Sequence, residues 1–261
     1  MSTSISGHGI RRHVLEQSKR ANVGHIGSAL SVADIVAALY DGVLRGRPTN
    51  PDRDRFVMSK GHAALALYAA LHMAGHISRE ELDTFSGDAS LLGVHPHHAV
   101  TGIDFSTGSL GQGLSMAAGA ALAARLQGSH RRVYALLSDA ECNEGSVWEA
   151  AMFAAHHRLD NLVAIVDLNG QQALGYTKDV VSLEPLEERW RAFGWDVQSV
   201  EGNDQEAVAS SIAGLNAPMP HVLIAHTTFG KGVSFMESQI RWHYMPMSDE
   251  QYSQALREIG A

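Results

Sequence analysis

The sequence contains a single cysteine, Cys142, among its 261 residues. One cysteine excludes an intramolecular disulfide and is typical of a reducing compartment, so we expect a cytoplasmic protein. No apolar run approaches the roughly 20 residues that a membrane-spanning helix needs. The N-terminus also has no apolar segment of the kind found in secretion signals. We therefore expect neither a membrane span nor export.

Charged residues are also scarce, at 18% of the chain, and basic residues are outnumbered: 20 Lys and Arg stand against 28 Asp and Glu, for a net charge of −8. Non-specific binding to nucleic acid depends on basic patches, so this balance argues against it. The low charged fraction indicates that partners cover much of the surface. A hydrophobic fraction of 45% supports a substantial core, and the length suits one large α/β domain over residues 1–261.

The middle of the chain reads as strand, helix, strand. Residues 133–137 form a short apolar run typical of a buried parallel strand, and residues 162–166 form a second. Between them, residues 144–157 place small apolar side chains at helical spacing. This order predicts a right-handed parallel crossover.

Polar residues follow both of these strands. Asp139 comes after the first and Asn169 after the second, and ligands of open parallel sheets bind beyond the carboxyl ends of strands. A carboxylate and an amide oxygen suit Mg²⁺, which usually keeps phosphate oxygens as further ligands. The small residues beside Asp139 would let backbone N–H groups approach a diphosphate. On the residues alone, an equally good interpretation is that Asp139 caps the helix and that Asn169-Gly170 is an ordinary turn.

The remaining pattern alternates helices and strands. We expect a helix over 10–20 and a second over 31–44 that begins at Ser31 as its N-cap. A short strand lies within 53–62. The other predicted helices are 63–74, 79–85, an Ala-rich helix ending at Leu126, 184–193, 204–215 and 249–259, and the other predicted strands are 195–200 and 220–225.

Three further features each have a functional and a plain interpretation. His25 lies between glycines and could be only a turn residue. The glycines at 108, 111 and 113 are a weak phosphate-loop signal and could instead permit close helix packing. The segment His95-Pro96-His97-His98 suggests zinc, but the sequence specifies no third or fourth ligand at a suitable spacing.

The spacing around Asp139 resembles the thiamine diphosphate motif of transketolases. That motif is Gly-Asp-Gly followed about thirty residues later by Asn, and here Asn169 stands thirty residues after Asp139. The first part reads Ser138-Asp139-Ala140, so both glycines are replaced while the Asp and Asn remain. Alanine suits position 140 only if its φ is negative, because a positive φ would favour glycine.

Six segments in family order, from Asn22 to Tyr244, carry the resemblance. Beyond the metal motif they are Gly24-His25-Ile26-Gly27, the segment 53–63 with His62, Gly93-Val94-His95-Pro96, the segment 107–113, and a last segment that holds 227–233 and Trp242-His243. Tyr244 stands where the family usually has glycine, and Ile26 where it often has proline.

The resemblance implies a fold and an activity. The fold is α/β: a doubly wound parallel sheet with helices on both faces, the diphosphate-binding domain of the family. The activity is transfer of a two-carbon ketol unit from a ketose to an aldose, with sugars or sugar phosphates as substrates. Because nothing in the sequence resembles the family's pyrimidine domain, the chain looks like the N-terminal subunit of a split transketolase. Its partner would be the C-terminal subunit carrying the pyrimidine domain, in an α₂β₂ heterotetramer active only when complete.

The resemblance also implies roles for individual residues. Mg²⁺ would be held by the Asp139 and Asn169 side chains and the Gln171 carbonyl. Thiamine diphosphate would contact Gly108, Ser109, Leu110, Ser138, Asp139, Ala140 and Asn169. His25, His62, His95 and His243 would face the substrate as hydrogen-bond partners or proton carriers. Glu144 would link paired active sites across an interface.

Other functions remain open on the sequence. A catalytically silent or regulatory partner subunit could keep the fold, and the altered motif at Ser138 and Ala140 favours it. A Rossmann dehydrogenase would require Gly-x-Gly-x-x-Gly after the first strand, which is missing. Deoxyxylulose phosphate synthases and ketoacid dehydrogenases share the metal motif, but the four histidines favour transketolase.

Overall fold

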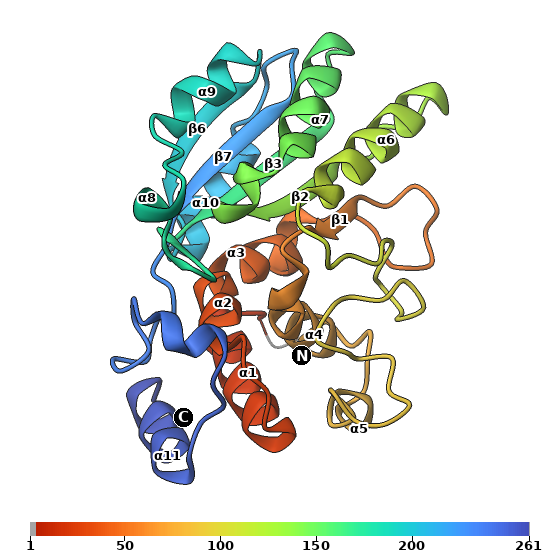
Figure 1. The fold of residues 1–261 in the computed structure, drawn as a ribbon. Coiled ribbons are helices and arrows are strands. Elements are labelled where there is room, and N and C mark those ends of the chain that lie inside the picture. The colour runs from red at the N-terminus through yellow and green to blue at the C-terminus, as the bar shows by residue number, and fades with distance from the viewer. Residues whose placement is uncertain (1–3, 261) are drawn as a thin grey trace.

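Five parallel strands form the centre of the computed structural model, which describes residues 4–260 (Figure 1). Neighbouring strands follow the order β1-β2-β3-β7-β6, and every pair in this sheet is parallel. The strands are β1 (Arg55–Met58), β2 (Val133–Ser138), β3 (Leu162–Leu168), β6 (Asp196–Glu201) and β7 (His221–His226). The crossover predicted from the middle of the chain is therefore confirmed.

Helices cover both faces of the sheet. On one face lie α1 (Gly7–Ala21), α2 (Ile26–Ser31), α3 (Ala33–Ala38), α4 (Ala64–Met73) and α10 (Gln205–Ala213); on the other lie α6 (Gln112–Leu126), α7 (Gly145–His156) and α9 (Leu186–Ala192). Shorter elements complete the chain: η1 (Leu39–Val43), η2 (Gly61–Ala63), α5 (Arg79–Leu82), η3 (Ala140–Asn143), β4 (Gln171–Gln172), β5 (Gly175–Tyr176), α8 (Thr177–Val180), η4 (Ile240–His243) and α11 (Asp249–Glu258). The predicted doubly wound α/β fold is confirmed.

Side chains that alternate along each strand explain why hydrophobic clusters form on both faces of the sheet. In β2, Val133, Ala135 and Leu137 pack in the cluster with α6, α7 and α9. Tyr134 and Leu136 pack in the other cluster, with α1 to α4. Successive side chains of a strand point to opposite faces, so a continuous apolar run serves a sheet that is covered on both sides.

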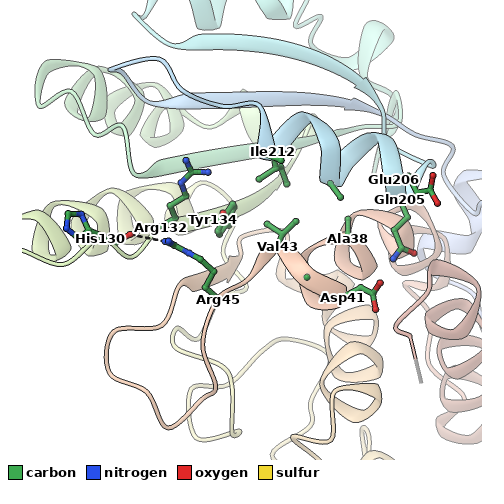
Figure 2. A pocket seen from close by; sticks show the side chains of 13 residues that line it. Ala38, Asp41, Val43, Arg45, His130, Arg132, Tyr134, Gln205, Glu206 and Ile212 are labelled. Atoms are coloured by element: carbon green, nitrogen blue, oxygen red, sulfur yellow. Dashed lines mark hydrogen bonds between the residues drawn. The ribbon is translucent and has the colours of Figure 1, made fainter. Parts of the chain in front are cut away.

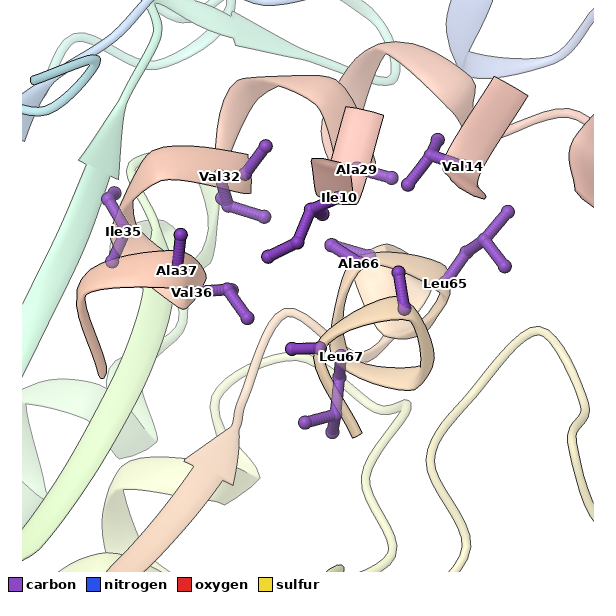
Figure 3. Close-up of a cluster of buried hydrophobic side chains, with 14 of the residues drawn as sticks. Ile10, Val14, Ala29, Val32, Ile35, Val36, Ala37, Leu65, Ala66 and Leu67 are labelled. Carbon is purple, nitrogen blue, oxygen red and sulfur yellow. The ribbon is translucent and has the colours of Figure 1, made fainter. Parts of the chain in front are cut away.

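The layer of α1 to α4 is closely packed by small and branched side chains (Figure 3). The face of α1 predicted from the sequence is buried: Ile10, Val14, Leu15 and Ser18 are all 0% exposed. They pack against side chains of α2, α3 and α4 such as Ala29, Val36 and Ala66. This layer supports the loops at the carboxyl ends of the strands.

The predicted helix over 31–44 is wrong at its start. The chain becomes helical at Ile26 and divides into α2, α3 and η1. Ser31 is the last residue of α2, and its hydroxyl donates a hydrogen bond to the Asp167 carboxylate instead of capping a helix. Gly27 lies within α2 and packs against Phe229, whose ring would lie 2.1 Å from a Cβ at this position, so no side chain fits there. The hairpin of β4 and β5 and the short α8 were not predicted.

Among residues 4–260, the structure has no helix that is both long and apolar enough to cross a membrane.

Candidate functional site

The ends of β2 and β3 bring Asp139 and Asn169 to the same edge of the sheet, as predicted. Ser138 pairs with Asp167 in the register of these strands. One Asp139 carboxylate oxygen accepts a 2.7 Å hydrogen bond from the Ala140 N–H, and the other accepts one of 2.7 Å from the Gly170 N–H. The fully buried carboxylate therefore joins the loop after β2 to the loop after β3.

The alternative in which Asp139 only caps a helix is correct in part. Asp139 caps the short η3, whereas the N-cap residue of α7 is Glu144. Ala140 lies inside η3 and is not among the described non-glycine residues with positive φ. The backbone at position 140 therefore accepts an alanine, because its φ is not positive.

The environment of Asp139 favours a cation beside it. Burial raises the pKa of the Asp139 carboxyl to about 7, and the negative charge of Asp167 acts in the same direction. The two backbone N–H groups oppose this shift only in part. A buried carboxylate of this kind is stabilised when a positive charge binds next to it.

The oxygen atoms around Asp139 have the chemistry that Mg²⁺ prefers. Asn169 contributes an amide oxygen, which accepts a 2.9 Å hydrogen bond from the Gln171 N–H. The side-chain oxygen of Gln171 is buried and has no hydrogen-bond donor among residues 4–260. Within residues 4–260 no group of three or more His, Cys, Asp or Glu side chains is placed to hold a metal. One carboxylate with amide and carbonyl oxygens suits a hard ion that keeps phosphate or water ligands.

A cavity of about 180 Å³ opens directly above these oxygens. It is lined by Ser28, Lys60, His62, Leu110, Ser138, Ala140, Asn143, Glu144, Asn169, Gln171, Gln172, Ala173, Phe229, Ile240 and His243. Eight of the predicted site residues are in this set, and they come from five separate segments. Gly108, Ser109, His25, His95 and Asp139 are not in the lining.

Three of the four predicted histidines form a cluster at the cavity. The ring centroids of His25, His62 and His243 are 5.0–5.6 Å apart in all three pairs. The His25 backbone N–H donates a 3.2 Å hydrogen bond to the His243 carbonyl, and His62 Nε2 lies 3.0 Å from the Ser28 hydroxyl. The Nδ1 atom of His25 is buried and has no hydrogen-bond partner in the described part of the chain.

All three clustered histidines are neutral at pH 7. Burial lowers the pKa of His62 well below its usual value, and the Lys60 ammonium adds to this effect. Burial and the neighbouring His25 lower the pKa of His243 to about 4, and burial also lowers the pKa of His25. Neutral imidazoles can both donate and accept hydrogen bonds, so the cluster suits the hydroxyl and carbonyl groups of a sugar.

His95 lies next to this cluster. Its exposed ring is near Gly108, where a Cβ would be 3.4 Å from the imidazole. His97 and His98 stack on each other, with ring centroids 4.7 Å apart, and both are exposed. Because no metal-holding group occurs in the described residues, the zinc interpretation of this segment has no structural support.

The glycines after Gly108 serve packing. A Cβ at Gly113 would lie 2.2 Å from the Ser59 hydroxyl, and one at Gly111 would lie 2.7 Å from the Glu144 Cβ. The buried Glu141 carboxylate accepts a 2.8 Å hydrogen bond from the Gly111 N–H and another from the Ser59 hydroxyl. Close packing is thus the better interpretation of Gly111 and Gly113.

Several residues at the site were missed in the sequence, among them Ser28, Lys60, Phe229 and Asp167. Ser28, Lys60 and Phe229 line the cavity, and Asp167 lies buried beneath it. Lys60 directly precedes the Gly61-His62 pair, and Asp167 stands two positions before Asn169. Both residues therefore lie close to motifs that carry the family resemblance. Their contacts join residues 107 positions apart, which no local pattern reveals.

A larger hollow, of about 660 Å³, lies elsewhere, between η1, the start of β2 and α10 (Figure 2). Arg45 and Arg132 lie at one end of it, and Asp41 and Glu206 at the other. It is at the amino ends of the strands and includes none of the predicted site residues. Volume alone therefore does not identify the functional site in this chain.

Comparison with known proteins agrees with this geometry. The chain matches the family described as transketolase, thiamine diphosphate binding domain, over residues 5–261. It is 44% identical over 255 residues to one of the subunits of the apulose-4-phosphate transketolase of Phocaeicola vulgatus, covering 96% of this chain and 91% of that protein. It is 41% identical over 256 residues to 6-deoxy-6-sulfo-D-fructose transketolase subunit SqwG of Clostridium sp., covering 96% of this chain and 93% of that protein.

Solved structures give the same result. The transketolase of Campylobacter jejuni superposes with a TM-score of 0.93 at 32% sequence identity. The match covers 98% of this chain but only 42% of that one, so this chain spans about two fifths of a full-length transketolase. The chain belongs to the transketolase family and constitutes its N-terminal, thiamine diphosphate-binding domain.

Proposed function

We propose that this chain is the diphosphate-binding subunit of a magnesium-dependent transketolase, which transfers a two-carbon ketol unit from a ketose to an aldose. The observation that carries the proposal is that one cavity combines a cation site with a cluster of neutral histidines. Asn169 and Gln171 line the cavity beside His62 and His243, and the buried Asp139 carboxylate lies behind them, bonded to the Gly170 N–H.

The residues around Asp139 would hold the cofactor. The Asp139 and Asn169 side chains and the Gln171 carbonyl would bind Mg²⁺, which neutralises a diphosphate. Gly108, Ser109, Leu110, Ser138 and Ala140 would contact thiamine diphosphate. When bound, thiamine diphosphate supplies a thiazolium ring that stabilises negative charge on the carbon it attacks.

The histidines would act on the substrate. His62 and His243 lie in the cavity wall, 5.2 Å apart between ring centroids, and would donate or accept hydrogen bonds at the ketose carbonyl and hydroxyl groups. His25, with its unpartnered Nδ1 atom, and His95 would complete the set. Their lowered pKa values keep His25, His62 and His243 uncharged, so a proton taken up in one step can be released in the next.

The complete enzyme would need a second polypeptide. The relatives from Phocaeicola vulgatus and Clostridium sp. are both described as subunits, and this chain spans about two fifths of a full-length transketolase. We propose a C-terminal subunit with the pyrimidine domain, in an α₂β₂ assembly with sugars or sugar phosphates as substrates. Glu144 is exposed beside the cavity, where it could link two active sites, and α7 exposes Met152 and Phe153 next to it.

The cytoplasmic location and the single domain over residues 1–261 remain predictions. The alternative of a silent subunit rested on Ser138 and Ala140; that Ala140 is not among the described residues with positive φ supports a loop that accepts an alanine at this position. Calorimetric titration of the chain and its partner subunit with thiamine diphosphate and Mg²⁺ separates these functions. We expect saturable binding that requires Mg²⁺; absence of binding would favour the silent subunit.

A further inference from the structure

The carboxylate of Asp167 is the meeting point of four segments beneath the cavity. It is 0% exposed and accepts hydrogen bonds from the Ser31 hydroxyl at 2.8 Å and from the Thr227 hydroxyl. The Lys60 ammonium and, at 2.9 Å, the Asn169 side-chain NH₂ donate to its other oxygen. The donors come from the end of α2, the turn after β1, the loop after β3 and the end of β7.

Lys60 balances the charge of this carboxylate. It is 1% exposed and forms an ion pair with Asp167. A buried charge of either sign is costly when its partner is removed, whereas replacing both partners together is often tolerated. The contact therefore holds the Lys60 ammonium group against the Asp167 carboxylate beneath the cavity.

The hydrogen bonds at Asp167 fix the orientation of Asn169. Both Asp167 oxygens act as acceptors, and the Asn169 amide turns its NH₂ group toward one of them. The Asn169 oxygen then faces the other way, toward the Gln171 N–H, in the loop whose Gly170 N–H donates to Asp139. Only the oxygen of an amide binds a cation, so this orientation decides whether Asn169 can be a ligand.

We infer that Asp167, buried and paired with Lys60, is a positioning residue that holds the Asn169 amide oxygen toward the metal beside Asp139. The inference rests on the proposed function, because it assigns the metal to Asp139 and Asn169. Outer partners of metal ligands typically contribute about 10- to 100-fold in metal affinity.

The test compares two variants of the full chain, each with its partner subunit. Lys60→Met with Asp167→Asn removes both charges at nearly constant volume, and an Asn at 167 no longer dictates which end of the Asn169 amide faces it. Calorimetry with thiamine diphosphate should give an Mg²⁺ affinity about 10- to 100-fold weaker than that of the unaltered protein. Thr227→Val is the matched control: it removes one donor to Asp167 but leaves the carboxylate and the Asn169 contact, so its Mg²⁺ affinity should stay within about 2-fold.

A purely structural role would give a different pattern. If both variants lose thermal stability but keep unaltered Mg²⁺ affinity, the inference is wrong. If the unaltered protein itself shows no Mg²⁺-dependent binding of thiamine diphosphate, the proposed function fails instead. The two failures are therefore distinguishable.

A measurement on the unaltered chain does not depend on the folding of any variant. Nuclear magnetic resonance of the Asn169 side-chain NH₂ should show one proton protected from exchange with solvent, because the carboxylate beneath it is buried. Asp167→Asn should abolish or reduce that protection. Exchange of both protons at the rate of an exposed amide in the unaltered chain would overturn the inference.

Discussion

The Tyr244 hydroxyl donates a hydrogen bond of 2.6 Å to the Ala173 carbonyl, and this contact joins the segment after His243 to the loop that holds Gln171. Tyr244 stands where the family usually has glycine. Its ring is half exposed and lies 5.1 Å from the His243 ring, measured between centroids. The residue thus connects the histidine cluster with the proposed metal loop along one edge of the cavity.

We expect Tyr244→Phe to loosen the loop after β3. The variant keeps the ring beside His243 and loses only the hydroxyl, so about 1 kcal/mol of stabilisation should disappear locally. Amide hydrogen exchange over residues 170–176 should become several-fold faster. Tyr176→Phe is the control, because the Tyr176 hydroxyl makes no hydrogen bond within residues 4–260; equal effects of both substitutions would show that the Ala173 contact contributes nothing.

Asp139→Asn should abolish Mg²⁺-dependent binding of thiamine diphosphate and keep the overall fold, while its NH₂ group leaves either the Ala140 or the Gly170 N–H without an acceptor. The substitution preserves size but removes the charge that would hold the cation. Burial raises the pKa of the Asp139 carboxyl, so removing its charge also removes the free-energy cost of burying that charge. Calorimetry measures the binding, and circular dichroism checks the fold. Asp160→Asn, on the exposed surface, should behave like the unaltered protein; unchanged affinity of Asp139→Asn would remove Asp139 from the site.

His62→Ala and His243→Ala should lower turnover more than cofactor affinity. Both rings line the cavity, and neither makes a hydrogen bond or salt bridge to Asp139 or Asn169 within the described part of the chain. Losing a general acid or base typically costs about 10²- to 10⁴-fold in rate. Ketol-transfer assays give the turnover, with His97→Ala as a nearly silent control. Full turnover in either variant would show that the histidine concerned has no part in the reaction.

Mg²⁺ affinity should fall as the pH is lowered below about 7. The Asp139 pKa is raised to about 7, so protons compete with Mg²⁺ for the carboxylate below this pH. Once the protonated carboxyl dominates, the apparent Mg²⁺ affinity should fall by about tenfold per pH unit. The pKa values of His62 and His243 are lowered, so these rings stay neutral as the pH passes through 7. Binding below pH 7 should therefore release about one proton.

Calorimetry at about pH 6 in buffers of different ionisation enthalpy measures this proton release. A titration of Mg²⁺ into thiamine diphosphate alone gives the share that comes from the cofactor. If the corrected release is zero, the Asp139 carboxyl is already ionised at this pH and the raised pKa is wrong.

The sequence predicted the layers of this fold well, because the strands are continuous apolar runs and the amphipathic α1 has a clear buried face. It failed where a distant contact decides the local structure. Residues 22–28 read as a turn because of their glycines, yet the chain is helical from Ile26. The glycine at position 27 is needed because Phe229, some two hundred residues later, leaves no room for a side chain.

In the candidate site, too, local sequence patterns predicted some residues and missed those that depend on distant contacts. Asp139, Asn169 and the clustered histidines could be predicted because each follows a strand or lies in a recognisable segment. The pairing of Lys60 with Asp167 could not, because neither residue has a local signal for a buried ion pair. Gly111 and Gly113 had two interpretations in the sequence, and only the packing against Glu144 and Ser59 decided between them.

Ketol transfer by the chain with and without a C-terminal transketolase subunit tests the central claim most directly. The purified chain is assayed with thiamine diphosphate, Mg²⁺, a ketose donor and an aldose acceptor, and the assay is repeated after the partner is added. We predict no transfer by the chain alone and rapid transfer by the pair, because the cavity supplies the metal and histidine side of the site only. Robust transfer by the chain alone would contradict this account.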